Sequence, residues 1–87
     1  MIKIIFFARL RDELNCPELN LEIKDINNKK TITVYELLDH LFKLNPQWQD
    51  IFNKRKFFTA VNQEIVQNNH DLSDGDEIAF FPPVTGG

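Results

Sequence analysis

The stretch SDGDEIAFFPP, residues 73–83, decides the fold, because it combines a tight turn, a strand and an abrupt end to that strand. Residues 73–76 are serine, aspartate and glycine, which favour turns through local side-chain hydrogen bonds and the backbone freedom of glycine. Glu77–Phe81 is a short run of strand-forming residues, which predicts a last strand. Pro82 and Pro83 end regular pairing, because proline has no amide hydrogen to donate. The chain should therefore leave the sheet directly after Phe81.

The N-terminal region predicts two further strands. Residues 2–7, IKIIFF, have a period of two with apolar side chains on both faces, as expected of an interior strand. The following ARLRDEL, residues 8–14, favours a short helical turn. Leu19, Leu21 and Ile23 alternate with polar residues, which indicates a half-buried strand with one face in water.

The middle of the chain predicts one main helix. Thr33–Glu36 has the pattern of a capping box, in which the hydroxyl and the carboxylate satisfy free amides at a helix start. Asn45-Pro46 should end the helix, and a further short turn packed on the core is expected over Trp48–Phe52. The apolar residues of the helix recur three and four positions apart and form a single stripe: Val34, Leu37, Leu38, Leu41 and Phe42.

Two more strands follow the helix. Phe57–Asn62 predicts a third strand and Glu64–Val66 a short fourth, with Asn62-Gln63 as a tight turn between them. We interpret Phe57 and Phe58 as ordinary sheet core without a cofactor role.

The resulting order is β, β, α, β, β, β, and one helix cannot cover both faces of a four- or five-stranded sheet. One face should carry the helix and the core, while the other stays at least partly open. If Phe6 and Phe80 face the helix, Phe7 and Phe81 face away from it. Two outward phenylalanines near the end of the last strand would form an apolar patch, and such patches mark interfaces.

Composition limits the classes of function. The chain has 87 residues, enough for one domain, with 43% hydrophobic and 26% charged residues and a formal net charge of −3. An acidic balance without a basic patch argues against nucleic acid as a partner. The apolar run at the N-terminus is too short for a signal-peptide core or a membrane span. Cys16 is the single cysteine, so no internal disulfide is possible, and we expect a cytoplasmic location.

No self-sufficient active site is evident. Gly75 is the only glycine before the last two residues, so neither a phosphate loop nor a dinucleotide fingerprint can form. His40, His70 and Cys16 match no common zinc spacing, so no metal site is expected. Three carboxylates near the last turn suggest either an acid–base pair or the solvated charges of a turn, and we favour the turn: Asp74, Asp76 and Glu77.

The C-terminal segment is the remaining candidate. The six residues from Pro82 onward reach about 20 Å when extended, and glycine leaves the backbone free to pass a narrow channel. Either this end is a flexible terminus without a function, or its carboxylate enters another protein. A carboxylate needs activation before oxygen can be replaced, and this chain has no nucleotide site, so a partner must perform that chemistry on Gly87.

Four segments together carry a resemblance to a known family. They are IKIIFFARLRDEL (residues 2–14), AVNQEIV (60–66), DGDEIAFF (74–81) and PPVTGG (82–87). The sequence resembles the small subunits of molybdopterin synthase, over the whole chain and most densely in the last third. The Gly-Gly end alone is shared with ubiquitin and with the thiamine sulfur carrier.

The resemblance implies an α+β, ubiquitin-like β-grasp domain over residues 1–81 and a flexible tail over residues 82–87. It implies a sulfur carrier that is not catalytic alone and binds no cofactor itself. An activating enzyme would use ATP to adenylate the carboxylate of Gly87, and sulfur would then replace one oxygen to give a thiocarboxylate. The tail residues that precede this group are Pro82, Pro83, Val84, Thr85 and Gly86.

The resemblance also implies the partner and the destination of the sulfur. The tail would enter the large subunit of the synthase, in a heterotetramer, and deliver sulfur to cyclic pyranopterin monophosphate to build the dithiolene that binds molybdenum. Positions matching Phe7, Ile65 and Phe81 would contribute to the apolar interface with the large subunit. Three alternatives stay open: a sulfur carrier for thiamine synthesis, a ubiquitin-like protein modifier, and a plain β-grasp interaction module.

Overall fold

The computed structural model describes residues 1–83, and the predictions made for residues 84–87 lie outside this range. Its elements follow one another as β1 (Ile2–Phe6), α1 (Ala8–Leu14), β2 (Glu18–Leu21), the 3-10 turn η1 (Ile23–Asp25), β3 (Ile32–Thr33), α2 (Val34–Leu44), α3 (Pro46–Lys54), β4 (Phe58–Val61), β5 (Glu64–Val66), β6 (Asp71–Leu72) and β7 (Glu77–Phe81).

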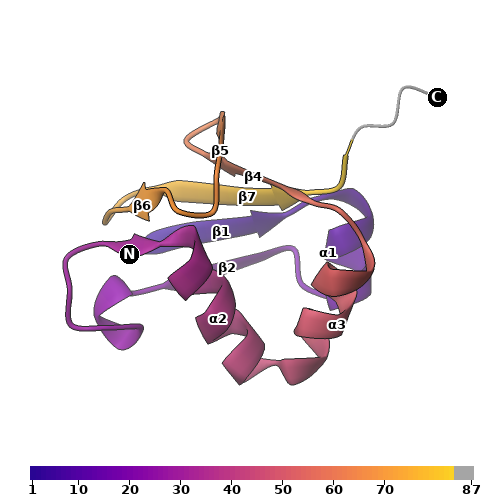
Figure 1. Ribbon diagram of the computed structural model, residues 1–87, viewed down its shortest axis with the longest axis horizontal. Helices are drawn as coiled ribbons and strands as arrows, with labels where there is room; N and C mark the ends of the chain where they lie inside the picture. Colours follow the sequence, from indigo (N-terminus) through magenta and orange to yellow (C-terminus); the bar gives the residue numbers. More distant parts are fainter. Residues whose placement is uncertain (84–87) are drawn as a thin grey trace.

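The main sheet has five strands in the order β2-β1-β7-β4-β5 (Figure 1). The first and last strands, β1 and β7, are parallel neighbours at its centre, with Phe6 opposite Phe80. All other pairs in this sheet are antiparallel. A separate two-stranded ribbon joins β3 and β6, with Ile32 opposite Leu72.

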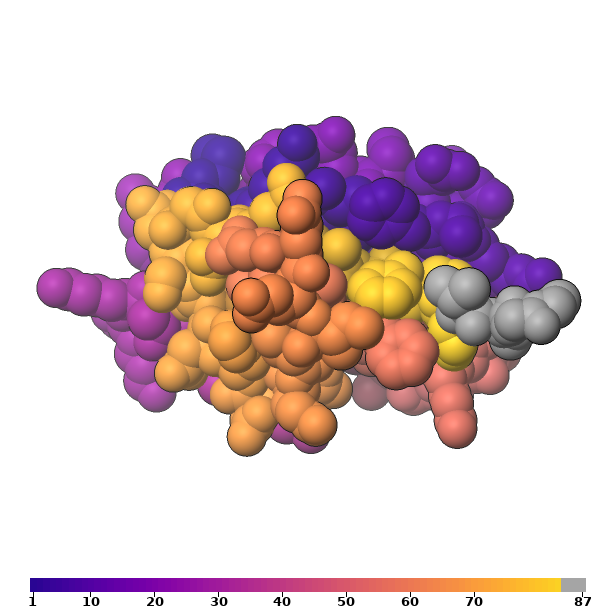
Figure 2. All heavy atoms as spheres, turned by 90° about the horizontal axis from the view of Figure 1, so that it is seen from above, coloured from indigo at the N-terminus to yellow at the C-terminus, as the bar shows by residue number. Residues whose placement is uncertain are grey.

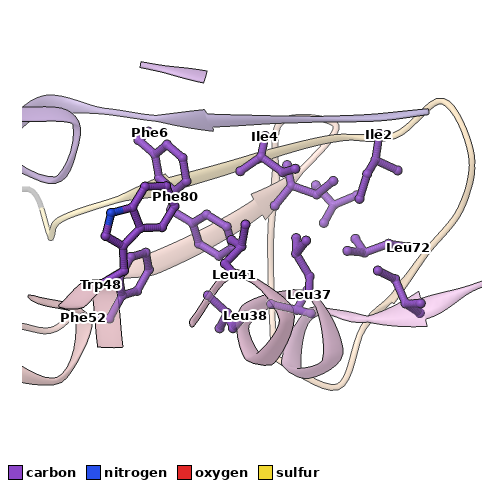
Figure 3. Close-up of a cluster of buried hydrophobic side chains, with 14 of the residues drawn as sticks. Ile2, Ile4, Phe6, Leu37, Leu38, Leu41, Trp48, Phe52, Leu72 and Phe80 are labelled. Carbon is purple, nitrogen blue, oxygen red and sulfur yellow. The ribbon is translucent and has the colours of Figure 1, made fainter. Parts of the chain in front are cut away.

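The helices cover one face of this sheet (Figure 1). Figure 3 shows the core between the two layers, where Ile2, Ile4 and Phe6 of β1 point toward Leu37 and Leu41 of α2. All five of these side chains are fully or almost fully buried. A mixed sheet with its main helix on one face is the β-grasp arrangement, and the predicted α+β class is confirmed.

Helix α2 begins and ends where the sequence predicts. The backbone amide of Glu36 donates to Oγ1 of Thr33 at 3.2 Å, and the amide of Thr33 donates to Oε1 of Glu36 at 3.0 Å, which completes the capping box. The helix ends at Leu44. Its buried side chains are Val34, Leu37, Leu38 and Leu41, which confirms the apolar stripe, with Phe42 partly buried against the core.

Helix α3 corrects the prediction of a short turn after Asn45. It runs for nine residues, Pro46–Lys54, and buries Trp48 and Phe52. Pro46 ends one helix and opens the next, because at the first helical position its missing amide hydrogen leaves no bond unmade. The expectation of a single main helix was therefore incomplete.

Smaller differences have local causes. The second strand stops at Leu21, since buried Ile23 begins the 3-10 turn η1. Residues 8–14 form the complete helix α1, with Leu10 and Leu14 buried. The tight turn at Asn62-Gln63 is confirmed, and both residues have positive φ, 50° and 74°. None of the helices described within residues 1–83 has the length and apolar character to cross a membrane.

Candidate docking surface at the end of the last strand

The end of β7 separates core side chains from surface side chains. Ile78 and Phe80 are fully buried, whereas Phe81 is half-buried on the opposite face. Phe7 follows β1 and is 46% exposed, and its amide donates to the carbonyl oxygen of Phe80 at 3.1 Å. That hydrogen bond continues the parallel ladder of β1 and β7, so Phe7 lies beside Phe81. The predicted outward orientation of both side chains is confirmed.

Strand β4 adds a third aromatic side chain to this face. Phe58 pairs directly with Phe81 across the antiparallel ladder, and their ring centroids are 5.8 Å apart. Phe58 and Ala60 are two residues apart in β4 and therefore point to the same face. Ala60 pairs with Ile65 of β5, and directly opposite residues share a face, so the outward row continues to Ile65. Ile65 is 68% exposed, the highest value among the large apolar side chains of the described residues.

The interpretation of Phe58 as ordinary sheet core was wrong. Phe58 is 43% exposed, whereas Phe57 packs against the core, with its ring 4.8 Å from that of Phe52. Adjacent residues in a strand point to opposite faces, so only one of the two can face the helices. The directly adjacent phenylalanines were the available signal, but they do not say which one faces inward.

We call this surface the exit face and define it by Phe7, Phe58, Ile65 and Phe81. The end of β1, the start of β4 and the end of β7 lie side by side on it (Figure 2). Each of these four side chains is exposed or half-buried, and none carries a titratable group. The exit face is therefore suited to docking and not to acid–base chemistry.

The carboxylates at the other end of β7 organise a turn. Asp76 accepts from the amide of Ser73 at 2.8 Å and from Nδ2 of Asn62 at 3.0 Å. Gly75 has a φ of +91°, in the left-handed region that glycine adopts without strain. These contacts favour the turn over an acid–base pair.

The other candidate groups lie apart from one another. His40 is half-buried on α2 and His70 is exposed in the loop before β6. Burial raises the pKa of the Cys16 thiol, which keeps it protonated and less reactive. Within the part of the chain that the structure describes, no three His, Cys, Asp or Glu side chains gather to hold a metal ion.

Comparison with known proteins places this geometry in a family. The ThiS family model matches residues 4–87. The chain is 41% identical over 87 residues to the molybdopterin synthase sulfur carrier subunit of Escherichia coli (strain K12), with all of both chains covered.

Solved structures agree with the fold. SAMP1 from Haloferax volcanii superposes with a TM-score of 0.75 at 23% identity, covering 99% of this chain and 98% of that chain. A chain in the protein–protein complex of subunits 1 and 2 of molybdopterin-converting factor from Helicobacter pylori 26695 superposes with a TM-score of 0.65 at 20% identity, covering 99% and 97%. At these identities the likeness shows the fold alone.

The molecule is thus a β-grasp domain whose last strand ends within an open apolar face. With a family model that spans nearly its whole length, the chain belongs to the ThiS family.

Proposed function

We propose that this chain is the sulfur carrier subunit of a molybdopterin synthase. The observation that carries the proposal is the position of the exit face, because Phe7 and Phe58 flank Phe81, directly before the chain leaves β7 at Pro82. A partner docked on this face would receive the residues beyond that point. The E. coli sulfur carrier, 41% identical over its whole length, supports the choice of this function.

The proposed chemistry belongs to Gly87 and to two partners. An activating enzyme adenylates the terminal carboxylate with ATP and releases pyrophosphate. Sulfur at the oxidation level of sulfide then displaces AMP from the acyl carbon, which gives a thiocarboxylate on Gly87. This chain supplies the carboxylate and the docking surface, while ATP and the catalytic groups belong to the activating enzyme.

The thiocarboxylate is the softer and better nucleophile, and in this proposal it delivers sulfur to cyclic pyranopterin monophosphate inside the large subunit. Two such deliveries build the dithiolene that binds molybdenum. The complex of subunits 1 and 2 in H. pylori supports a large-subunit partner. A heterotetramer and a cytoplasmic location are further parts of the proposal.

The test changes the end of the chain without changing the folded core. One variant carries an added C-terminal alanine and the other is Gly86→Val. One extra residue moves the reacting carbon by about 3.5 Å, and a misplacement of about 1 Å can cost on the order of a hundredfold in rate. We expect unchanged thermal melting and loss of product in both variants, assayed with the activating enzyme, ATP, a sulfur source and the large subunit.

An extended protein that remains fully active, and that mass spectrometry shows to be uncleaved, would overturn the sulfur-carrier proposal. It would leave an interaction module as the remaining function. Thiamine-directed transfer would be indicated instead if the thiocarboxylate forms but the large subunit yields no pterin product.

A further inference from the structure

A groove of about 470 Å³ continues the exit face beyond Phe58 and Ile65. It lies where β4 and β5 diverge. Thr59 pairs with Val66, but the residues that precede Thr59 do not pair with the residues that follow Val66. The amide of Tyr35 donates to the carbonyl oxygen of Asn68 at 3.0 Å, which ties one wall of the groove to helix α2. The groove therefore lies beside a segment that is hydrogen-bonded to α2, and it shares Phe58 and Ile65 with the exit face.

The charges along this groove are of one sign. Arg55 and Lys56 line it, and none of its lining residues is Asp or Glu. Nε of Arg55 lies 3.0 Å from Oε1 of Glu13, so that cation is already paired. Lys56 is exposed and forms no ion pair with any of residues 1–83, and neither does nearby Lys54. This excess of positive charge is local, because the whole chain carries −3.

We propose that an acidic segment of the large subunit docks in this groove, with a carboxylate opposite Lys56 and apolar side chains on Phe58 and Ile65. This inference rests on the proposed function and adds the chemistry of the partner. Phe57, Phe58 and Ile65 give the groove an apolar lining, which a free phosphate or nucleotide would leave exposed. A protein segment covers that lining and also supplies the negative charge.

The groove then sets the rate and the specificity of docking. Charges at the rim of an interface act mainly on the association rate, because they steer the encounter, and salt screens them. The apolar exit face holds the complex once it has formed. A partner with a basic segment at this position would be repelled by Lys56, most strongly at low salt.

The experiment compares Lys56→Glu with Lys30→Glu, which makes the same change in net charge on an exposed loop residue before β3. Association of the full-length chain with purified large subunit is followed by stopped-flow fluorescence at low and high salt. We expect Lys56→Glu to slow association by about fivefold or more at low salt, with a smaller effect at high salt, and Lys30→Glu to stay within about twofold of the unchanged chain. Both variants should melt like the unchanged chain, because both lysines are exposed.

A second measurement identifies the contact itself. A carbodiimide joins a lysine amine to a carboxylate only when the two touch, so it should link Lys56 to an Asp or Glu of the large subunit. Lys56→Arg should abolish that link while keeping the association rate. Equal association rates for Lys56→Glu and Lys30→Glu, or a lack of the Lys56 link, would overturn the groove proposal alone. An unchanged chain that does not bind the large subunit at all would overturn the proposed function as well.

Discussion

At the scale of single residues, two neighbouring phenylalanines of β7 have opposite roles. Phe80 is fully buried, with its ring 5.9 Å from that of Phe6 and 5.7 Å from that of Phe52. Phe81 meets only the half-exposed Phe58 among the aromatic rings of residues 1–83. Because a strand alternates its faces, one step along the backbone separates a stabilising side chain from a docking one.

This difference gives a paired test. Phe80→Ala should lower the free energy of unfolding by about 3–5 kcal/mol, because it opens a cavity in a closely packed cluster. Phe81→Ala should cost about 1 kcal/mol, since the removed ring is only partly buried. Urea unfolding followed by circular dichroism gives both values, and titration with the large subunit should show weaker binding for Phe81→Ala. Equal losses of stability combined with normal binding by Phe81→Ala would contradict the assignment of faces.

Glu36 makes stability depend on pH. The backbone amide of Thr33 donates to its carboxylate, and together with the side chain of Asn27, whose Nδ2 lies 2.7 Å from Oε2, this lowers the pKa of Glu36 against the opposing effect of burial. A lowered pKa means that the unfolded chain takes up the proton first as pH falls. The stabilisation is therefore complete well above the unfolded-state pKa of about 4.3 and is lost as pH falls through the folded-state pKa.

We expect Glu36→Gln to make the free energy of unfolding less dependent on pH between about 5 and about 3. Urea titrations at several pH values measure this slope. Asn27→Ala, which removes one donor and keeps the carboxylate, should reduce the slope by a smaller amount. Identical slopes for Glu36→Gln and the unchanged chain would show that this carboxylate does not contribute.

At the scale of elements, the β4–β5 hairpin depends on its two-residue turn. Both central residues, Asn62 and Gln63, have positive φ, as a two-residue turn between twisted strands requires. Asparagine tolerates this conformation, but glutamine is strained in it. Asn62 also ties the hairpin to β7, because its Oδ1 accepts from the amide of Glu77 at 3.0 Å and its Nδ2 donates to Asp76 at 3.0 Å.

Glycine should therefore have opposite effects at the two positions. Gln63→Gly should raise the free energy of unfolding by about 0.5 kcal/mol. The strain energy that glycine removes at this positive φ exceeds the entropic stabilisation that glycine gives to the unfolded chain. Asn62→Gly should lower it by about 1 kcal/mol, since two hydrogen bonds to the last strand and its turn are lost. Thermal and urea unfolding of both variants measure whether the free energy of unfolding rises or falls. A Gln63→Gly variant that is less stable than the unchanged chain would show that Gln63 is not strained.

Elements marked by local chemistry were predicted well from the sequence. The capping box at Thr33, the turn at Asn62 and the last strand all follow from residues within a few positions of one another. Helix α3 was underestimated, because a proline that ends one helix can also begin another. The inward orientation of Phe57 and the exposure of Phe58 depend on the register of β4 against β7, which distant parts of the chain determine.

At the scale of the whole molecule, the fold separates its core from its docking surface. Ile78 and Phe80 of β7 are fully buried on the face that carries the helices, whereas Phe81 is half-buried on the opposite face, in the exit face. The parallel pair β1 and β7 joins the two ends of the domain at the centre of the sheet. Stability should therefore depend on the sheet and the helices, and partner chemistry on the residues after Phe81.

Truncation after Phe81 tests this separation and the predicted domain boundary together. We expect the melting temperature to fall by less than about 5 °C, which for a domain of this size corresponds to about 1 kcal/mol or less. The removed residues begin with the half-buried Pro82 and Pro83, so their removal should cost a small amount of packing energy. Phe80→Ala in the full chain provides the contrast, because it keeps those residues and should melt at a much lower temperature. The truncated chain should still compete with the full chain for the large subunit through its exit face, yet give no thiocarboxylate with the activating enzyme. A truncated chain that fails to fold would place residues after Phe81 within the structural domain and would shift the boundary toward the C-terminus.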